Sequence, residues 1–536
     1  KKNFFSTNDL AIEIEHFELD STTKISNEHF LYADDIRIKM GAYEQTFLDS
    51  LHTLRLDSAF LSTRQKSVAL YNTRFFSSQK SDDKSYFDFA IPKTSLTNIS
   101  WLEAYKQEAL QLSTVVFENP TIDLTLLAQK DSVRTLEESA KEVEQVALRF
   151  FGKYALDSLV IKDANVAWNT DNQELKKLLP LKDVSVKVEG IRLPQQEETQ
   201  AIPFVEHITA RIPELETTMP DSLYAIGGKN IVISTKETAF SVDSLYLQPR
   251  FLPYSFGTLD NQETDWISLD VNTIRLSRFD WYGFLTRNDL RLGKVEADGV
   301  RLSSFRDKRL PDGKLEDKSM LQGSLADLKS PISVDSVLLS NSSIRYREHS
   351  DQSNRVGKLR LDSLNALLLH LGNSPTDSTL TLLVSTRVMD AAQLQARMIF
   401  QMRDPSDAYM MEGMMTEMDM KTLNALVMPL TSIRINKGEI ESMQFKIKAN
   451  DDLARGVLLL RYKHLKVKLL DKRKMAAGPD ELFATLIANT LIKNKNPGVF
   501  KTLRIGEVEL ERDKTKSIFN YWAKIFIAGI KSSVGL

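Results

Sequence analysis

The chain has 536 residues, and its 70 basic and 72 acidic side chains leave no net positive charge to draw it to nucleic acid. It contains no cysteine, which excludes disulfides, thiolate metal sites and a cysteine nucleophile. Charged residues make up 26% of the chain, a share that argues against wholesale disorder. No run of 18 apolar residues occurs, so no helix that spans a bilayer is predicted.

The first element in chain order is a strand over residues 10–15, where Leu10, Ile12 and Ile14 alternate with polar or small residues. A helix is predicted over residues 132–151, with Asp131 as its N-cap. Strand alternation returns at Val184, Val186 and Val188, and Gly190 then shifts its phase as a bulge would. Period-2 alternation of this kind, repeated along the chain, indicates strands with one apolar face.

The C-terminal part continues the pattern. Residues 433–447 predict a hairpin that turns at Asn436-Lys437-Gly438-Glu439. Leu458 and Leu460 lead into Leu465, Val467 and Leu469, with a slip of phase near Lys463-His464. Further helices are predicted over residues 481–493 and 517–530.

The dipeptide Asp-Ser occurs ten times, mostly between an apolar residue and an alternating run, as in Leu156-Asp157-Ser158-Leu159 and Val334-Asp335-Ser336-Val337. Asp and Ser side chains bond nearby backbone groups, so we interpret these copies as turn chemistry at the start of strands. A cation site is the alternative, but no acidic cluster with EF-hand spacing accompanies them.

The predicted fold is mainly β: an elongated, twisted, largely antiparallel sheet of repeated strand units that forms an apolar groove, with a few short helices. We expect N-terminal β repeat units over 1–130, a helix plus central β repeat units over 131–330, a C-terminal β module over 331–475 and a helical or strand tail over 476–536. The same alternation would also fit a sandwich whose two apolar faces cover each other.

No catalytic constellation is found. The seven histidines are scattered, and the HExxH, GxGxxG, Walker lysine and GxSxG patterns are all absent. We therefore expect neither an enzyme, nor a cofactor, nor a metal site, although carboxylates are abundant enough that a glycosidase pair stays open.

Two apolar clusters invite a binding interpretation. The methionine-rich patch from Met410 to Met420 fits core packing better than an adaptable apolar surface. The C-terminal helix combines apolar and aromatic residues with lysines, which fits a segment lying at a membrane surface as well as a helix that caps the sheet. The candidate membrane-interface residues are Ile518, Phe519, Tyr521, Trp522, Ile525, Phe526 and Ile530.

The order of motifs in residues 415–471 resembles the C-terminal module of AsmA-like proteins. Met420-Lys421-Thr422-Leu423-Asn424 would close a preceding unit, followed by strands that contain Gly438-Glu439-Ile440, Ala454-Arg455-Gly456 and Leu465-Lys466-Val467-Lys468-Leu469-Leu470. The closing Asn520-Tyr521-Trp522 adds to the resemblance, and the upstream chain matches by pattern only.

The resemblance implies a protein of the AsmA-like and TamB-like family, bacterial envelope relatives of the chorein-type bridge-like lipid transporters. Such proteins are held in the inner membrane by an N-terminal helix, which here would precede Lys1, and project into the periplasm. Their partners would be a membrane, a phospholipid or other acyl lipid, and an envelope protein, in support of outer-membrane biogenesis.

Acyl chains would then lie on a groove floor made by alternating apolar residues, with no catalytic residue needed. The candidate floor residues are Val184, Val186, Val188, Leu458, Leu460, Leu465, Val467 and Leu469. The alternative function is a non-enzymatic β-scaffold that binds proteins or glycans in the cell envelope.

Overall fold

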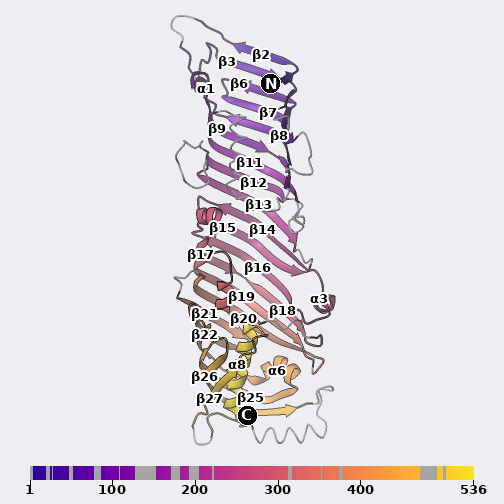
Figure 1. Ribbon diagram of the computed structural model, residues 1–536, viewed down its shortest axis with the longest axis vertical. Helices are drawn as coiled ribbons and strands as arrows, with labels where there is room; N and C mark the ends of the chain where they lie inside the picture. The colour runs from indigo at the N-terminus through magenta and orange to yellow at the C-terminus, as the bar shows by residue number, and fades with distance from the viewer. Residues whose placement is uncertain are drawn as a thin grey trace. The chain divides into compact units, whose positions relative to one another are not determined.

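The computed structural model describes residues 4–19, 24–26, 28–46, 52–77, 86–107, 109–126, 153–170, 181–191, 205–219, 223–311, 317–351, 353–373, 378–470, 492–498 and 502–535. The protein is mainly β, with a large mixed sheet and few short helices, as the sequence predicts (Figure 1). The chain divides into two compact units, one of residues 1–222, 226–243 and 279–287, the other of residues 223–225, 244–278 and 288–536.

The first unit is a run of hydrogen-bonded strands with the helices α1 (Trp101–Gln107) and α4 (Trp281–Arg287). Its strands are β1 (Phe4–Thr7), β2 (Leu10–Glu15), β3 (Asp35–Met40), β4 (Tyr43–Thr46), β5 (His52–Leu56), β6 (Ser58–Ser62), β7 (Ser67–Ser77), β8 (Tyr86–Thr97), β9 (Ala109–Glu118), β10 (Thr121–Leu126), β11 (Lys153–Thr170), β12 (Leu181–Ile191) and β13 (His207–Thr218). The strands β14 (Tyr224–Ser234) and β15 (Ala239–Pro249) are divided between the two units.

The second unit holds the longest helix, α8 (Ile518–Val534), among its described residues. Its other helices are α3 (Pro253–Asp260), α5 (Leu321–Ala326), η1 (Met420–Leu423) and α6 (Asn424–Thr431). Its strands are β16 (Trp266–Ser277), β17 (Leu290–Asp298), β18 (Arg301–Asp307), β19 (Ile332–His349), β20 (Val356–Gly372), β21 (Thr379–Val388), β22 (Ala392–Gln401), β23 (Tyr409–Met415), β24 (Met418–Asp419), β25 (Ile433–Ala449), β26 (Leu453–Leu469) and β27 (Gly506–Glu511).

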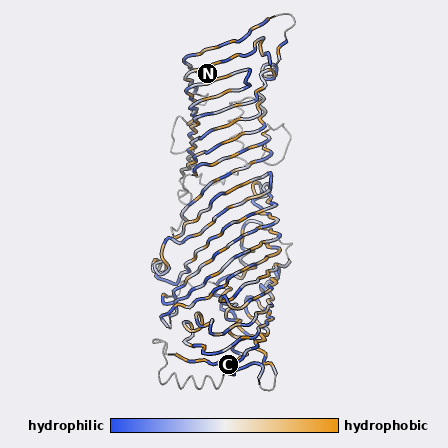
Figure 2. The backbone as a smooth tube through the Cα atoms, turned by 180° about the vertical axis from the view of Figure 1, so that it is seen from behind, coloured by the Kyte–Doolittle hydropathy of each residue, from blue (hydrophilic) through white to orange (hydrophobic). Residues whose placement is uncertain are grey.

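Strand pairing is largely antiparallel, as predicted. The exceptions among the described pairings are parallel contacts of β11 with β9 and β10, and of β19 with β17 and β18. Parallel neighbours require a connection of a dozen or more residues, and residues 127–152 and 308–331 provide these lengths. Along the strands the hydropathy alternates residue by residue, which Figure 2 shows as alternating orange and blue.

The prediction that Asp-Ser copies mark strand starts holds for some described copies and is wrong for others. Ser58 begins β6 and Ser378 directly precedes β21. Asp157, Asp335 and Asp362 lie inside the long strands β11, β19 and β20, each of which carries a residue at positive φ and a shift of register within it. Asp and Asn tolerate the left-handed conformation through their local hydrogen bonds, so a long strand can bend there and still remain one strand.

Aspartate side chains hold some of these bends to the neighbouring strand. The amide of Asn72, which has positive φ, donates to Asp57 at 2.8 Å. Asn341 has the same backbone conformation and donates to Asp298 at 2.7 Å. Local hydrogen bonding of this kind is therefore present at Asp57 and Asp298, whereas Asp335 forms an ion pair with Arg278 at 3.0 Å.

The hairpin predicted within residues 433–447 is also wrong, because β25 continues through it as one strand. Gly438 has φ of 153° and lies within the second of three shifts of register against β26, where His464 has φ of 59°. The glycine therefore makes a bulge rather than a turn. Gly190, where the sequence predicts a bulge, has φ of 67°, but the pairing of β12 with β11 shows no shift of register at this glycine.

The C-terminal helix is confirmed and extends to Val534. The Ser517 hydroxyl accepts a hydrogen bond from the Asn520 amide at its N-terminus, and Gly535 ends it in the left-handed conformation. The predicted helix at 132–151 lies outside the described residues. The helix at 481–493 does so too except for Ile492 and Lys493, which are not helical. The four-part division of the chain stays a prediction.

Candidate functional site: the apolar faces of the two units

One face of the first unit carries an unbroken row of apolar residues that crosses nine neighbouring strands. Residues that are directly opposite each other in a ladder lie on the same face of the sheet. The row runs across β2, β3, β6, β7, β8, β9, β11, β12 and β13 through Ile12, Ile38, Leu61, Val68, Leu96, Val115, Leu159, Val188 and Ile208.

A second row on the same face lies two residues along each strand. It runs through Leu10, Met40, Ala59, Leu70, Thr94, Phe117, Ile161, Val186 and Ala210, with Thr94 as its one polar member. The predicted floor residues Val186 and Val188 therefore belong to two adjacent rows of one continuous apolar face.

The opposite face of the same strands is more polar: one row there is entirely polar, while the next is mixed and includes Phe60, Val116 and Val160 beside Lys39 and Lys187. The polar row is Glu13, Arg37, Ser62, Ser67, Thr97, Thr114, Ser158, Glu189 and His207. The hydroxyls of Thr114 and Ser158 are 3.0 Å apart, and Lys187 donates to Glu189 at 2.8 Å. Hydrogen bonding to the Lys187 ammonium lowers the pKa of Glu189. These strands thus present an apolar face on one side and a more polar face on the other.

The described side chains on the apolar face of the first unit are less buried than those of a core. None of the nine side chains in the first row is fully buried: Ile12 is exposed and the others are half-buried. Fully buried contacts occur at two places along the strands. Ile99, Leu112 and Leu156 form a cluster near α1, against which Trp101 packs, and Val184 forms another with Ala164 and Leu181.

The second unit has two comparable rows, each crossing the ten strands β16, β17, β19, β20, β21, β22, β23, β25, β26 and β27. One runs through Ile274, Ala297, Leu339, Ala366, Val384, Ala396, Gly413, Phe445, Leu458 and Gly506. The other runs through Leu276, Val295, Val337, Leu368, Leu382, Met398, Met411, Ile447, Gly456 and Val508.

Burial changes along these two rows. From β16 to β21 every member is half-buried, whereas Met411, Ile447 and Leu458, on β23, β25 and β26, have no exposed surface. The helix α8 makes the difference, because it packs on this face: Phe526 meets Phe445 edge-on at 4.9 Å between ring centroids. In the described part of the second unit, α8 covers this face near β25 to β27, Leu321 and Leu325 of α5 pack on the same core, and the members from β16 to β21 stay half-buried.

Two glycines allow α8 to lie this close. A side chain at Gly506 would meet the Gly529 carbonyl oxygen at 2.2 Å, and one at Gly529 would meet the Leu458 Cβ at 2.9 Å. Trp522 fixes the helix from its other side, since its indole donates to the Tyr409 hydroxyl at 3.1 Å.

The predicted C-terminal floor residues all lie in the covered region. Leu458, Leu460, Leu465 and Val467 are buried in the core of the second unit, and Leu469 is half-buried. Asn424 of α6 bonds the backbone of Ile435 through both its amide and its carbonyl group, at 2.8 Å each. This contact holds α6 against the start of β25, beside Val467.

The predicted membrane-interface residues divide by helix face. Tyr521 and Ile525 are buried against the sheet, and burial raises the pKa of Tyr521 to about 12. Ile518, Trp522 and Phe526 pack at the margin of the same core, whereas Phe519 is 70% and Ile530 37% exposed. The helix therefore caps the sheet with one face. Among the described residues, none of the helices combines the length and the apolar character needed to cross a bilayer.

The methionine-rich patch is mostly core. Met411, Met415, Met418 and Met420 are buried in the main hydrophobic cluster, as predicted. Met414 points to the other face of the sheet. There it lines two adjoining hollows of about 490 Å³ each, with Leu338, Leu367, Leu383, Val457 and Leu459 among the other apolar lining residues.

Polar clusters in the described residues have structural partners. His349 is 7% exposed and lies between the Tyr254 hydroxyl at 3.0 Å and the Asn354 carbonyl oxygen at 3.1 Å. Hydrogen bonds from Arg309 lower the pKa of the nearby Asp307. No group of three or more potential metal ligands occurs in the part of the chain that the structure describes.

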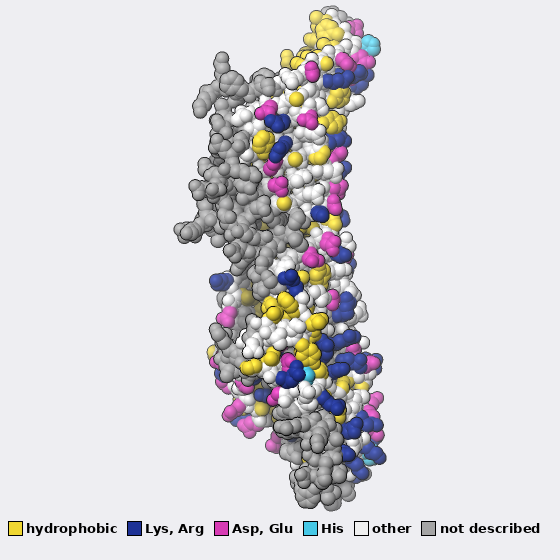
Figure 3. Space-filling view, turned by 90° about the vertical axis from the view of Figure 1, so that its right-hand side faces the viewer, with side chains coloured by type: hydrophobic (Ala, Val, Ile, Leu, Met, Phe, Trp, Pro, Cys, Tyr) yellow, Lys and Arg dark blue, Asp and Glu magenta, His cyan; other side chains and the backbone are white. Residues whose placement is uncertain are grey.

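Surface charges are mixed rather than segregated on the side shown in Figure 3, where lysines and arginines lie among acidic side chains along the right-hand border.

In the comparison with known proteins, no protein-family model and no curated protein matches the chain.

Proposed function

We propose that this protein binds lipids through the apolar faces of its sheets and transfers them, as a periplasmic, membrane-tethered protein of the AsmA-like type would. The single observation that supports the proposal best is the pair of rows across nine strands of the first unit, whose apolar side chains stay half-buried or exposed. Exposure of such apolar surface to water is unfavourable in free energy unless an apolar ligand or partner covers it.

The dimensions suit acyl chains. Neighbouring strands lie about 4.8 Å apart, so a row across nine strands runs for about 40 Å, more than the length of one extended fatty acyl chain. Each CH₂ group removed from water contributes about 0.8 kcal/mol. A continuous floor therefore lets a chain move along the sheet with little change in free energy, while a charged headgroup stays in water. Passive transfer of this kind requires no nucleophile, metal or cofactor.

The matched variants Val188→Glu and Val160→Glu test the proposal. Val188 lies in the first apolar row, whereas Val160 is a neighbour on the opposite face, directly across from Lys187. Purified full-length protein is extracted with organic solvent, bound phospholipid is quantified by mass spectrometry, and transfer of a fluorescent phospholipid between vesicles is followed.

We expect bound lipid and transfer rate to fall at least fivefold in Val188→Glu and to stay within twofold of wild type in Val160→Glu, with unchanged circular dichroism for both. Wild-type protein that carries no lipid and transfers none would refute the proposal and favour the β-scaffold that binds proteins or glycans. Equal loss in both variants would show that the apolar rows do not hold the lipid.

A further inference from the structure

The strand β2 ends the row of paired strands in the first unit with a free edge. It pairs with β3, and no other described strand pairs with it. The Gly41 amide donates to the Asp9 carbonyl at 3.0 Å. By the alternation of an antiparallel ladder, the peptide groups of Leu10, Ile12 and Ile14 then point away from β3, toward the free edge.

The side chains of these three residues are unusually exposed for aliphatic residues in a sheet. Leu10 is 58%, Ile12 57% and Ile14 56% exposed. Ile12 and Leu10 are the first members of the two apolar rows, and each lacks a neighbour on one side only. One more strand would therefore continue both rows.

Proteins usually protect such an edge with proline, lysine, a bulge or an inward-pointing charge. The six residues Leu10–Glu15 contain no proline or lysine, although Asp9, directly before them, has φ of 55°. An edge with exposed apolar side chains and outward peptide groups is the structure that strand-adding partners use, with main-chain hydrogen bonds for affinity and alternate side chains for specificity.

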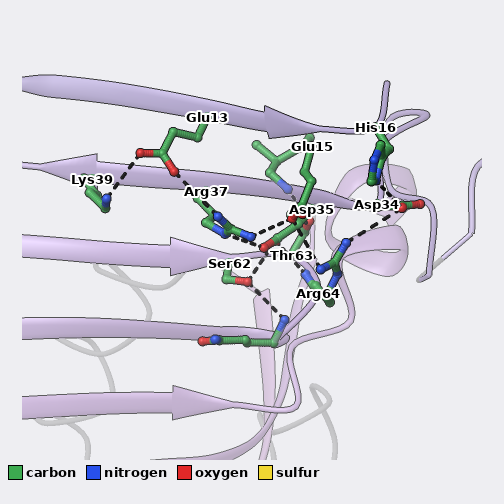
Figure 4. A network of polar contacts seen from close by, with 12 residues as sticks. Glu13, Glu15, His16, Asp34, Asp35, Arg37, Lys39, Ser62, Thr63 and Arg64 are labelled. Carbon is green, nitrogen blue, oxygen red and sulfur yellow. Dashed lines mark hydrogen bonds and ion pairs between the residues drawn. The ribbon is translucent and has the colours of Figure 1, made fainter. Parts of the chain in front are cut away.

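The other face of β2 indicates the charge of the partner. Glu13 and Glu15 lie on that face with side chains 54% and 38% exposed (Figure 4). On the side of β3, Glu13 pairs with Arg37 and Lys39, and Glu15 pairs with Arg37 and Arg64, whereas no described residue lies on their other side. A strand on the free side would place its alternate residues beside the same two carboxylates. Basic residues there would continue the cross-strand pairing of opposite charges.

A second copy of this chain is a poor occupant. The antiparallel registers of two β2 strands that oppose two or three of their apolar residues place Glu13 opposite Glu13, Glu13 opposite Asp9, or Glu15 opposite Asp9. Like charges directly opposite each other destabilise a ladder. We propose that β2 is a docking edge for an extended strand of another polypeptide in which apolar residues alternate with lysine or arginine.

The test uses the full chain and a labelled seven-residue peptide that alternates valine with lysine, followed by fluorescence anisotropy. The comparison peptides replace lysine by glutamate, or carry N-methyl groups on the bonding edge. The protein variants are Ile12→Pro, which removes only the outward N–H, its control Ile12→Val, and Glu13→Lys.

We expect the lysine peptide to bind the wild-type chain. Ile12→Pro should weaken this binding at least tenfold, whereas Ile12→Val should change it less than twofold. Glu13→Lys should reverse the preference, so that the glutamate peptide binds better than the lysine peptide. N-methylation tests the same main-chain bonds without any change to the protein. The inference is overturned if the lysine peptide does not bind, if N-methylation has no effect, or if β2 cross-links to a second copy. Binding to phosphatidylglycerol vesicles that Ile12→Pro leaves intact would instead assign the edge to a lipid surface.

Discussion

A buried carboxylate distinguishes the open and the covered parts of the apolar face. Val467 is 6% exposed in the core of the second unit, whereas Val186 is half-buried in the first. A glutamate at position 467 would have no described basic partner within the core, and such burial raises a carboxyl pKa by up to 3–5 units. Since each unit corresponds to about 1.4 kcal/mol, we expect Val467→Glu to cost on the order of 4 kcal/mol or more at pH 7.

The same substitution at Val186 leaves the carboxylate in contact with water, so we expect a cost of about 1 kcal/mol, mainly from lost apolar packing. Native-state hydrogen exchange, read by mass spectrometry on peptides from β12 and β26, measures the two sites separately. The cost of Val467→Glu should also shrink as the pH falls toward 5 and the carboxyl group is protonated.

Equal destabilisation by the two variants would refute this reasoning, because it would mean that the face near Val186 is covered as completely as the one near Val467. The matched control is Val160→Glu, which places the same group on the opposite face of the first unit, across from Lys187. We expect it to lower the free energy of unfolding by less than about 1 kcal/mol.

Three further predictions concern the packing that holds each unit together. Gly506→Ala should force α8 away from the sheet and lower the free energy of unfolding by about 1–3 kcal/mol in urea titrations, because the new Cβ would collide with the Gly529 carbonyl; an unchanged value would contradict this packing. Asp451→Ala should cost about 3 kcal/mol, since it leaves the fully buried Arg512 side chain without its ion-pair partner, and Arg512→Met combined with it should recover part of the loss. Burial raises the pKa of Asp35, but hydrogen bonds from the Arg64 amide, the Ser62 hydroxyl and Arg37 outweigh it and leave this pKa lowered. The stability that Asp35 contributes is therefore complete above about pH 4 and lost as the pH falls below it, and Asp35→Asn should flatten this dependence in hydrogen exchange of β3.

The sequence alone was sufficient for the fold class and for the apolar face of individual strands. Alternation is a local property, because successive side chains of a strand point to opposite faces, so Val186 and Val188 could be assigned to one face without knowledge of any neighbour. The helix α8 was likewise predictable from its Ser517 cap and its apolar residues, which are local signals.

The register between strands and the burial of their apolar faces depended on tertiary structure. That Leu159, Val188 and Ile208 lie in one row follows from hydrogen bonds between strands far apart in sequence, and no single strand encodes that alignment. Whether a strand bends or turns was also undecided, because Gly438 permits both and the pairing of β25 with β26 selects the bulge. Leu458 and Val188 show the same alternation, yet Leu458 is fully buried beneath α8 and Val188 is half-buried. Exposure of the apolar face is therefore set by what packs on it, which is a property of the folded chain rather than of the strand.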